Sequence, residues 1–236
     1  MSRRLSPELP LTRRGLLVGG AGLLVGAAAA EGANLAIGGP GPSKQLTPGE
    51  DLMREHGVLK RILLTYRNVL DRQSANQPVP TAAVHDGATI IHHYIEGFHE
   101  GLEEAYVFPP LRTAGQLVET VDTLLVQHAR GRRLTSRVLD ITTAATLTTA
   151  AGTQLGSDLA AFLRMYEPHE AREDTVVFPA LRQLLSPSEL RSLADTFVAE
   201  EDKQFGPDAF TDMVDRVAGI EKTLGISDLS QFTPTV

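Results

Sequence analysis

The sequence predicts an all-α fold, an antiparallel four-helix bundle with two additional C-terminal helices. Apolar residues recur at intervals of three and four along four long segments, which is the period of an amphipathic helix. The alternating pattern of a half-buried β-strand is nearly absent. One phrase that contains histidine and glutamate occurs twice, so the four segments form two similar pairs. Such pairs are typical of a helical bundle.

The first two predicted helices are separated by a break at 76–80. The first opens at 47–50 with TPGE, a capping box with proline at the first helical position. Its apolar stripe includes His56, so this histidine is expected to face the core. The second helix is expected over 81–108 and should end before the Pro-Pro pair at 109–110, because proline interrupts the hydrogen-bond ladder.

The third helix is predicted over 115–141 and the fourth over 157–185. A Thr/Ala-rich segment, 142–153, joins them and is partly compatible with a helix. Pro168 lies inside the fourth helix, where it is expected to introduce a bend. Together the four helices define a predicted bundle domain over 47–185.

The C-terminal extension, 186–236, is predicted to add two helices to the bundle. A second capping box, SPSE at 186–189, opens a helix that runs to about Lys203. A Gly-Pro pair at 206–207 precedes the last helix. That helix should end near Gly225, because glycine readily adopts the left-handed conformation that follows a helix.

Residues 1–30 resemble a twin-arginine export signal. Arg13 and Arg14 precede an apolar, Gly/Ala-rich run that ends in AAA at 28–30, which fits an A-x-A cleavage site. The run spans about 16 residues, fewer than the ~20 that a helix needs to cross a bilayer. We therefore expect export by the twin-arginine route to the periplasm, the cell envelope or the exterior, with membrane association only if the signal stays uncleaved. The Gly/Pro-rich residues 31–46 are predicted to form a linker.

Composition excludes several kinds of site. The chain has no cysteine, which rules out disulfides, iron–sulfur clusters, thiolate zinc sites and cysteine nucleophiles. It has no tryptophan and few aromatic residues, so an aromatic platform for nucleic acids is not expected. The formal net charge is −7, and it becomes about −10 after cleavage at Ala30, which removes four arginines and one glutamate. An acidic surface weighs against DNA, RNA or anionic membranes as the main partner.

The repeated phrase occupies 99–112 and 169–182. Each copy places a histidine and a glutamate four residues apart, which in a helix puts both side chains on one face. A further histidine precedes each copy on a core-facing stripe. Because a buried, ionised glutamate is costly unless a cation compensates it, the set predicts a cage for two metal ions. The candidate metal ligands are His56, His99, Glu103, His128, His169 and Glu173.

The donor atoms of this set indicate which metal it would hold. Four imidazoles with two carboxylates favour iron, manganese, zinc or copper over magnesium and calcium. Two facing helix pairs with bridging carboxylates favour two non-haem iron ions, with manganese or zinc as the lesser alternatives. Open coordination positions would admit a small ligand such as O2, peroxide or NO. The alternative is a structural bundle with a vestigial, metal-free site.

Four segments of the chain resemble the hemerythrin-like (HHE cation-binding) proteins: EHGVLKR, FHEGLEEAYVFP, QHARGRR and PHEAREDTVVFP. The resemblance covers about 48–185. It implies a four-helix bundle around a non-haem di-iron site that binds O2 or a related ligand. It also implies that the six candidate residues are the iron ligands, with the two glutamates bridging the irons.

The chain departs from the O2 carriers of that family at one informative position. They have a further histidine where this chain has Arg132, and they use an aspartate at the position of Asp174. Residues four apart lie about 40° apart around a helix and residues five apart about 140°, so Glu173 is the preferred ligand and Asp174 the lesser candidate. The missing histidine favours redox turnover over simple O2 carriage. Two functions therefore stay open, O2 binding and enzymatic peroxide breakdown or ferrous-iron oxidation.

Tyr106 follows His99 by seven residues, one turn beyond Glu103, and its counterpart in the second copy is Val176. One hypothesis is that Tyr106 reaches the metal pair as a ligand or as a hydrogen-bond donor. The alternative is a core tyrosine whose hydroxyl is satisfied elsewhere. The remaining glutamates of the two copies, Glu100, Glu104 and Glu170, are expected to be solvated.

Overall fold

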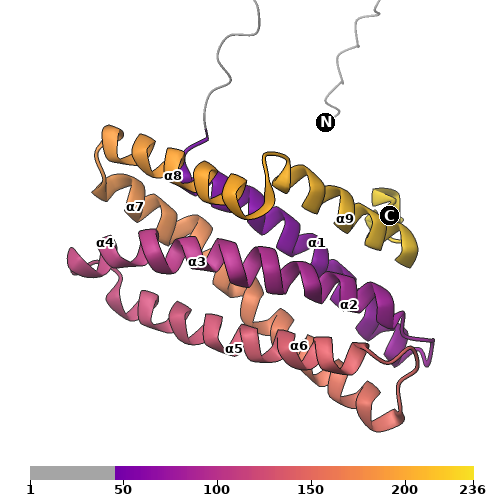
Figure 1. Ribbon diagram of the computed structural model, residues 1–236. Helices are drawn as coiled ribbons and strands as arrows, with labels where there is room; N and C mark the ends of the chain where they lie inside the picture. Colours follow the sequence, from indigo (N-terminus) through magenta and orange to yellow (C-terminus); the bar gives the residue numbers. More distant parts are fainter. Residues whose placement is uncertain (1–45) are drawn as a thin grey trace, which may run out of the picture. The chain divides into compact units, whose positions relative to one another are not determined.

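Helices make up the regular structure of residues 46–236, which are the residues that the computed structural model describes. The predicted all-α fold is confirmed, a helical bundle with extra C-terminal helices (Figure 1). The predicted export signal at 1–30 and linker at 31–46 fall outside the described residues, apart from Leu46. Within that range, none of the helices combines the length and the apolar character needed to cross a membrane.

Four helical runs form the bundle. The first is α1 (Pro48–Ser74) and the third is α5 (Val118–Thr142). The second and fourth runs each contain π-helical turns. The second comprises α2 (Thr81–Ile90), η1 (Ile91–His99), α3 (Glu100–Leu102), η2 (Glu103–Val107) and α4 (Phe108–Thr113). The fourth comprises α6 (Thr149–Arg172), η3 (Glu173–Val177) and α7 (Phe178–Leu184).

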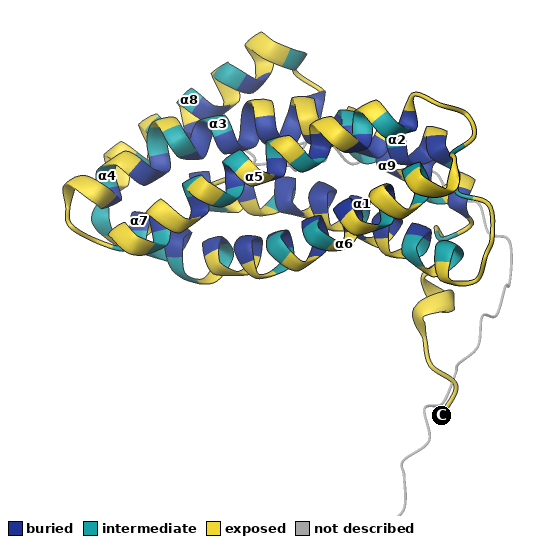
Figure 2. Ribbon diagram, turned by 90° about the horizontal axis from the view of Figure 1, so that it is seen from below, coloured by how far each residue is buried: buried dark blue, intermediate teal, exposed yellow. Residues whose placement is uncertain are grey.

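Each run packs against two others, α1 against α2 and α6, and α5 against α2 and α6. Buried residues line the inner faces of the helices, and exposed residues line the outer faces (Figure 2). The amphipathic pattern of the sequence therefore points the apolar stripes into one shared core. The six candidate metal ligands also lie within that core.

The C-terminal extension lies over α1 and α2. It consists of α8 (Pro187–Phe205), α9 (Ala209–Leu224) and a short 3-10 turn, η4 (Leu229–Phe232). Phe205 packs against the rings of Tyr94 and Phe98, and Arg61 of α1 pairs with Glu221 of α9 at 2.6 Å. The extension thus covers the face of the bundle behind His56 and His99.

Both predicted capping boxes are confirmed. Thr47 and Ser186 each accept a hydrogen bond from the third residue of their helix, and the glutamate there binds back to the cap backbone. A side-chain cap of this kind stabilises a helix by about 1 kcal/mol. Gly225 ends α9 with a φ of 72°, as its left-handed role requires.

The expected end of the second helix before Pro109 is wrong. The run continues through both prolines to Thr113. A π-helical turn, η2, stands immediately before them, and there the α-helical ladder is already interrupted, so prolines that lack an N–H are tolerated. The fourth run also begins earlier than expected, at Thr149, because Thr148 caps it by accepting from the Ala151 amide.

The π-helical turns η2 and η3 occupy equivalent places in the two copies of the repeated phrase. Each begins at the glutamate of its copy, Glu103 or Glu173. A π-turn closes i→i+5 hydrogen bonds, so the residues after it are rotated relative to an α-helix. Such turns concentrate at functional sites. Their repetition marks both glutamates as special positions of the backbone.

Candidate metal centre

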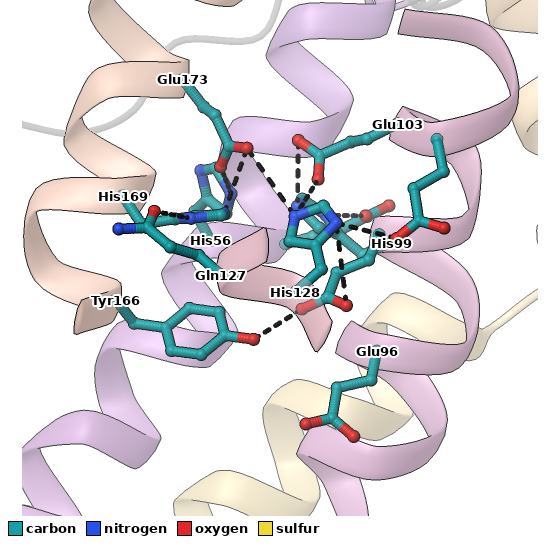
Figure 3. Close-up of polar contacts among 12 residues, drawn as sticks. His56, Glu96, His99, Glu103, Gln127, His128, Tyr166, His169 and Glu173 are labelled. Atoms are coloured by element: carbon teal, nitrogen blue, oxygen red, sulfur yellow. Dashed lines mark hydrogen bonds and ion pairs between the residues drawn. The ribbon is translucent and has the colours of Figure 1, made fainter. Parts of the chain in front are cut away.

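The six candidate residues converge in the middle of the bundle (Figure 3). They come from all four helical runs, and none is more than 4% exposed. They fall into two groups. Within each group, the ligand atoms all lie within 4.8 Å of one another. The first group is His56, His99 and Glu103, and the second group is His128, His169 and Glu173.

The Nε2 atoms of the four imidazoles point at the two carboxylates. The distance from Nε2 to the nearest Glu103 oxygen is 3.6 Å for His99 and 3.5 Å for His128. The distance from Nε2 to the nearest Glu173 oxygen is 3.5 Å for His56 and 3.1 Å for His169. Each carboxylate is therefore approached by one histidine from each group. A carboxylate placed between two sets of imidazoles can bridge two cations.

The outer nitrogen, Nδ1, of every imidazole has its own acceptor. Three are carboxyl groups: Asp174 for His56 at 2.7 Å, Glu55 for His99 at 2.7 Å and Glu104 for His128 at 2.9 Å. The fourth is an amide, Gln127 for His169 at 2.8 Å. An acceptor at Nδ1 fixes the tautomer, so the Nε2 lone pair faces inward, as in many metal sites.

The donor set fits cations. Both carboxylate oxygens of Glu103 and of Glu173 are buried without a hydrogen-bond partner, as are Nε2 of His99 and of His128. Burying acceptors without donors costs free energy, and a bound cation removes that cost. Asp174 instead lies outside the cage, 29% exposed and bound to the outer nitrogen of His56. Glu173 is thus the inward carboxylate, as the helical spacing favours.

The pKa values of these groups move in opposite directions. Burial, with the nearby charge of Glu173, raises the pKa of Glu103 well above its usual range. Burial would also raise the pKa of Glu173, but its interactions with the His169 and His56 imidazoles outweigh burial and lower that pKa. Burial would lower the pKa of His56, but its hydrogen bond to Asp174 and the nearby negative charge of Glu173 raise it to about 9. In the metal-free protein, protons therefore neutralise part of the negative charge of the buried carboxylates.

Metal binding should therefore release protons and become tighter as the pH rises toward 9. His56 is protonated at pH 7, and Glu103 keeps its proton to a higher pH than an ordinary carboxyl does. Both protons must leave before the nitrogen and oxygen can bind a cation. Calorimetric titration at pH 7 in buffers of different ionisation enthalpy measures this release. A binding enthalpy that does not depend on the buffer would contradict the expectation.

Tyr106 is not brought to this group. Its ring is partly buried and lies 6.1 Å from the ring of Phe197 in α8. Tyr106 lies within the π-turn η2, which has more residues per turn than an α-helix. Tyr106 is therefore rotated away from the helix face of Glu103. Tyr106 therefore joins the contact between the bundle and the C-terminal extension.

A different tyrosine lies beside the cage. Tyr166 is 1% exposed, and its ring centroid is 5.2 Å from that of His169. Its hydroxyl donates to Glu100 Oε1 at 2.6 Å. Tyr166 lies in α6 and Glu100 in α3, 66 residues away, so the local sequence does not reveal this pairing.

The expectation that the remaining glutamates are solvated is wrong. Glu100 is 1% and Glu170 0% exposed, and Glu104 is partly buried. Arg132 Nη2 lies 2.8 Å from Glu100 and 2.7 Å from Glu104, and Lys60 pairs with Glu170. These cations come from neighbouring helices, so the local sequence could not show that burial is compensated.

Gly131 makes room for the Tyr166 hydroxyl. A Cβ at this position would overlap that hydroxyl and its ring. Gly131→Ala should therefore push Tyr166 away from Glu100 and lower the free energy of unfolding by about 2 kcal/mol, the usual cost of overpacking. Urea denaturation of the metal-free protein measures this loss. Gly219→Ala in α9 is the matched control, since nothing lies near its Cβ, and it should gain about 0.5–1 kcal/mol. Equal stability of the two variants would refute the overlap.

Comparisons with known proteins agree with this geometry. The family model described as "Hemerythrin HHE cation binding domain" matches residues 47–181. Uncharacterised proteins from Mycobacterium bovis and from two strains of Mycobacterium tuberculosis are 55% identical over 191 residues, which cover 80% of this chain and 75% of theirs. No solved structure matches the chain.

Proposed function

The chain belongs to the hemerythrin HHE cation-binding family, and we propose that it holds two non-haem iron ions and binds O2 or a related small ligand. The observation that carries the proposal is the placement of Glu103 and Glu173. Each is fully buried, each has two oxygens without a hydrogen-bond partner, and each faces an imidazole from both groups. Two carboxylates in that position fit a pair of bridged cations.

The donor types favour iron. The chain offers imidazole nitrogen and carboxylate oxygen and no thiolate, a set that suits iron and, less well, manganese or zinc. When bound, an iron pair supplies redox electrons and open positions for an oxygen species. The residues of the chain supply the rest, namely position, charge and exclusion of water.

Aromatic rings cover two of the four imidazoles. The Phe178 ring stacks on His56 and the Phe108 ring stacks on His128, each with centroids 5.7 Å apart. Both rings are at most 3% exposed. They pack against the imidazoles and help to hold them in place. The hydrogen bonds at Nδ1 fix the direction of each inward nitrogen.

The second candidate function is catalase-like breakdown of hydrogen peroxide. The observation that favours it is Arg132, whose guanidinium pairs with Glu100 and Glu104 and offers no ligand atom. The four imidazoles then divide two and two, and both metals keep open positions. In the overall reaction, one peroxide is reduced to two waters while the other is oxidised to O2, with two protons passing between them. Oxidation of ferrous iron by the same site is the related alternative.

Anaerobic loading with ferrous iron, followed by O2 or peroxide, tests both candidates. Absorption spectra should change on addition of O2 and revert on its removal if the protein is an O2 binder. Sustained O2 evolution from peroxide, measured with an oxygen electrode, would identify the enzyme instead. Absence of any response to either oxidant in iron-loaded protein would contradict both.

Export by the twin-arginine route is part of the proposal. It is supported by Arg13 and Arg14 ahead of an apolar run with an AAA sequence at 28–30. Conversion of both arginines to lysine should retain the protein in the cytoplasm, because the pathway reads the arginine pair. Cell fractionation with antibody detection measures this. An unchanged extracytoplasmic fraction would show that another route is used.

A further inference from the structure

The four outer acceptors of the cage differ in kind. On the first group they are the carboxyl groups of Asp174 and Glu55. Within 46–236, neither of these forms an ion pair with a lysine or arginine. A carboxyl acceptor at Nδ1 raises the basicity of a metal-binding imidazole. The first group therefore has a carboxyl acceptor at the outer nitrogen of both imidazoles.

On the second group, one acceptor is an amide and the other is a carboxyl group that also pairs with a cation. His169 donates to the amide oxygen of Gln127, which is neutral at every pH. His128 donates to Glu104, but the same Glu104 oxygen lies 2.7 Å from the Arg132 guanidinium. The cation withdraws charge from that oxygen. The second group therefore offers two poorer nitrogen donors, although its ligand types are the same as those of the first group.

One member of the second group, His169, borders a surface groove although it is only 4% exposed. A groove of about 450 Å³ runs between α5 and α6, and His169 forms part of its wall. Its lining is mainly polar and includes Thr123, Gln127 and Arg172. On the side of the first group, a smaller pocket of about 190 Å³ ends at Phe178, and none of the six candidate residues lines it.

We propose that Gln127 makes the two metal positions unequal, so that the position held by the second group is the exchangeable one and takes up hydrogen peroxide from the groove. The inference rests on the proposed di-iron function. Poorer nitrogen donors would bind the metal of the second group less tightly and would make it a stronger Lewis acid for an added ligand. The polar groove suits a hydrogen-bonding ligand such as peroxide better than an apolar diatomic gas. Gln127 acts through His169, so it is a positioning residue.

Anaerobic titration with ferrous iron alone tests the inequality. The wild-type protein should load in two steps whose dissociation constants differ by roughly tenfold or more, the usual effect of an outer-shell partner. Gln127→Glu should bring the two steps together, and Gln127→Met, which removes the acceptor, should separate them further. Mössbauer spectra of the ⁵⁷Fe-loaded proteins give a second readout, two distinct doublets in the wild type that converge in Gln127→Glu. Gln116→Glu is the matched control, since it adds the same charge on an exposed residue.

The outcomes separate the two proposals. Fewer than two irons per wild-type chain would overturn the di-iron function itself. Two irons that bind in one step would overturn the inequality. A step separation that Gln127→Glu and Gln127→Met leave unchanged would overturn the role of Gln127. In both cases the di-iron site stands.

The groove has its own test. Thr123→Trp should fill it and slow the absorption change on mixing with peroxide severalfold, with iron content unchanged. An unchanged rate would overturn the route.

Discussion

Glu103→Gln is expected to abolish loading of the second iron and to stabilise the metal-free protein. The Glu103 oxygens face imidazoles of both groups, so an amide there removes the bridging charge while keeping the volume. In the metal-free protein the same carboxyl is fully buried and its pKa is strongly raised, so its burial opposes folding. Elemental analysis after anaerobic loading measures the metal, and urea denaturation with a chelator present measures the stability.

Glu200→Gln is the matched control for this variant. Within 46–236, the Glu200 side chain of α8 is 40% exposed and pairs with Lys203 at 3.0 Å. It should leave iron content unchanged and alter stability little, since exposed ion pairs contribute about 0–1 kcal/mol. If Glu103→Gln retained two irons per chain, Glu103 would not be a bridge.

Iron loading is expected to raise the thermal stability of the protein by a large amount. A cation that binds only the folded chain stabilises it by about 4 kcal/mol at a free concentration a thousand times its dissociation constant. For a chain of this size, that corresponds to a rise in the unfolding temperature of roughly 10 °C. Anaerobic differential scanning calorimetry with ferrous iron measures the shift, and a chelator should reverse it.

Two controls accompany that measurement. Magnesium at the same concentration should have no effect, because it prefers oxygen ligands and the cage is rich in imidazole. Glu103→Gln should lose most of the iron-dependent rise. An unfolding temperature that iron leaves unchanged would mean that the buried carboxylates do not serve a metal.

Most of the features that the sequence could predict come from the repeated phrase and from the helix caps. Side chains four apart on one helix share a face whatever the tertiary structure, so His99 with Glu103, and His169 with Glu173, could be paired from spacing alone. The capping box at Thr47 depends only on neighbouring residues, and the structure confirms it. Local rules sufficed because these features are local.

The outer acceptors of the imidazoles could not be predicted in the same way. Glu55 and His99 are 44 residues apart, and Gln127 and His169 are 42 residues apart. Their contact depends on how the helices sit against each other, which periodicity does not specify. The burial of Glu100 depends likewise on Arg132 from another helix.

The π-turns explain the remaining differences. An ordinary 3.6-residue period placed Tyr106 on the face of Glu103 and ended the helix at the prolines beyond it. The wider turn at Glu103 rotates the later residues of the run and accommodates Pro109 and Pro110. Residue propensities alone do not show where such a turn forms. In both copies it forms at the proposed bridging glutamate.

The central claim is a pair of bridged irons held by the six buried residues. Its most direct test is the combined iron content and electron paramagnetic resonance spectrum of the ⁵⁷Fe-loaded, oxidised protein. We predict two irons per chain and no signal, because two ferric ions joined through shared carboxylates couple to a state without net spin. One iron per chain with the signal of an isolated ferric ion would contradict the claim.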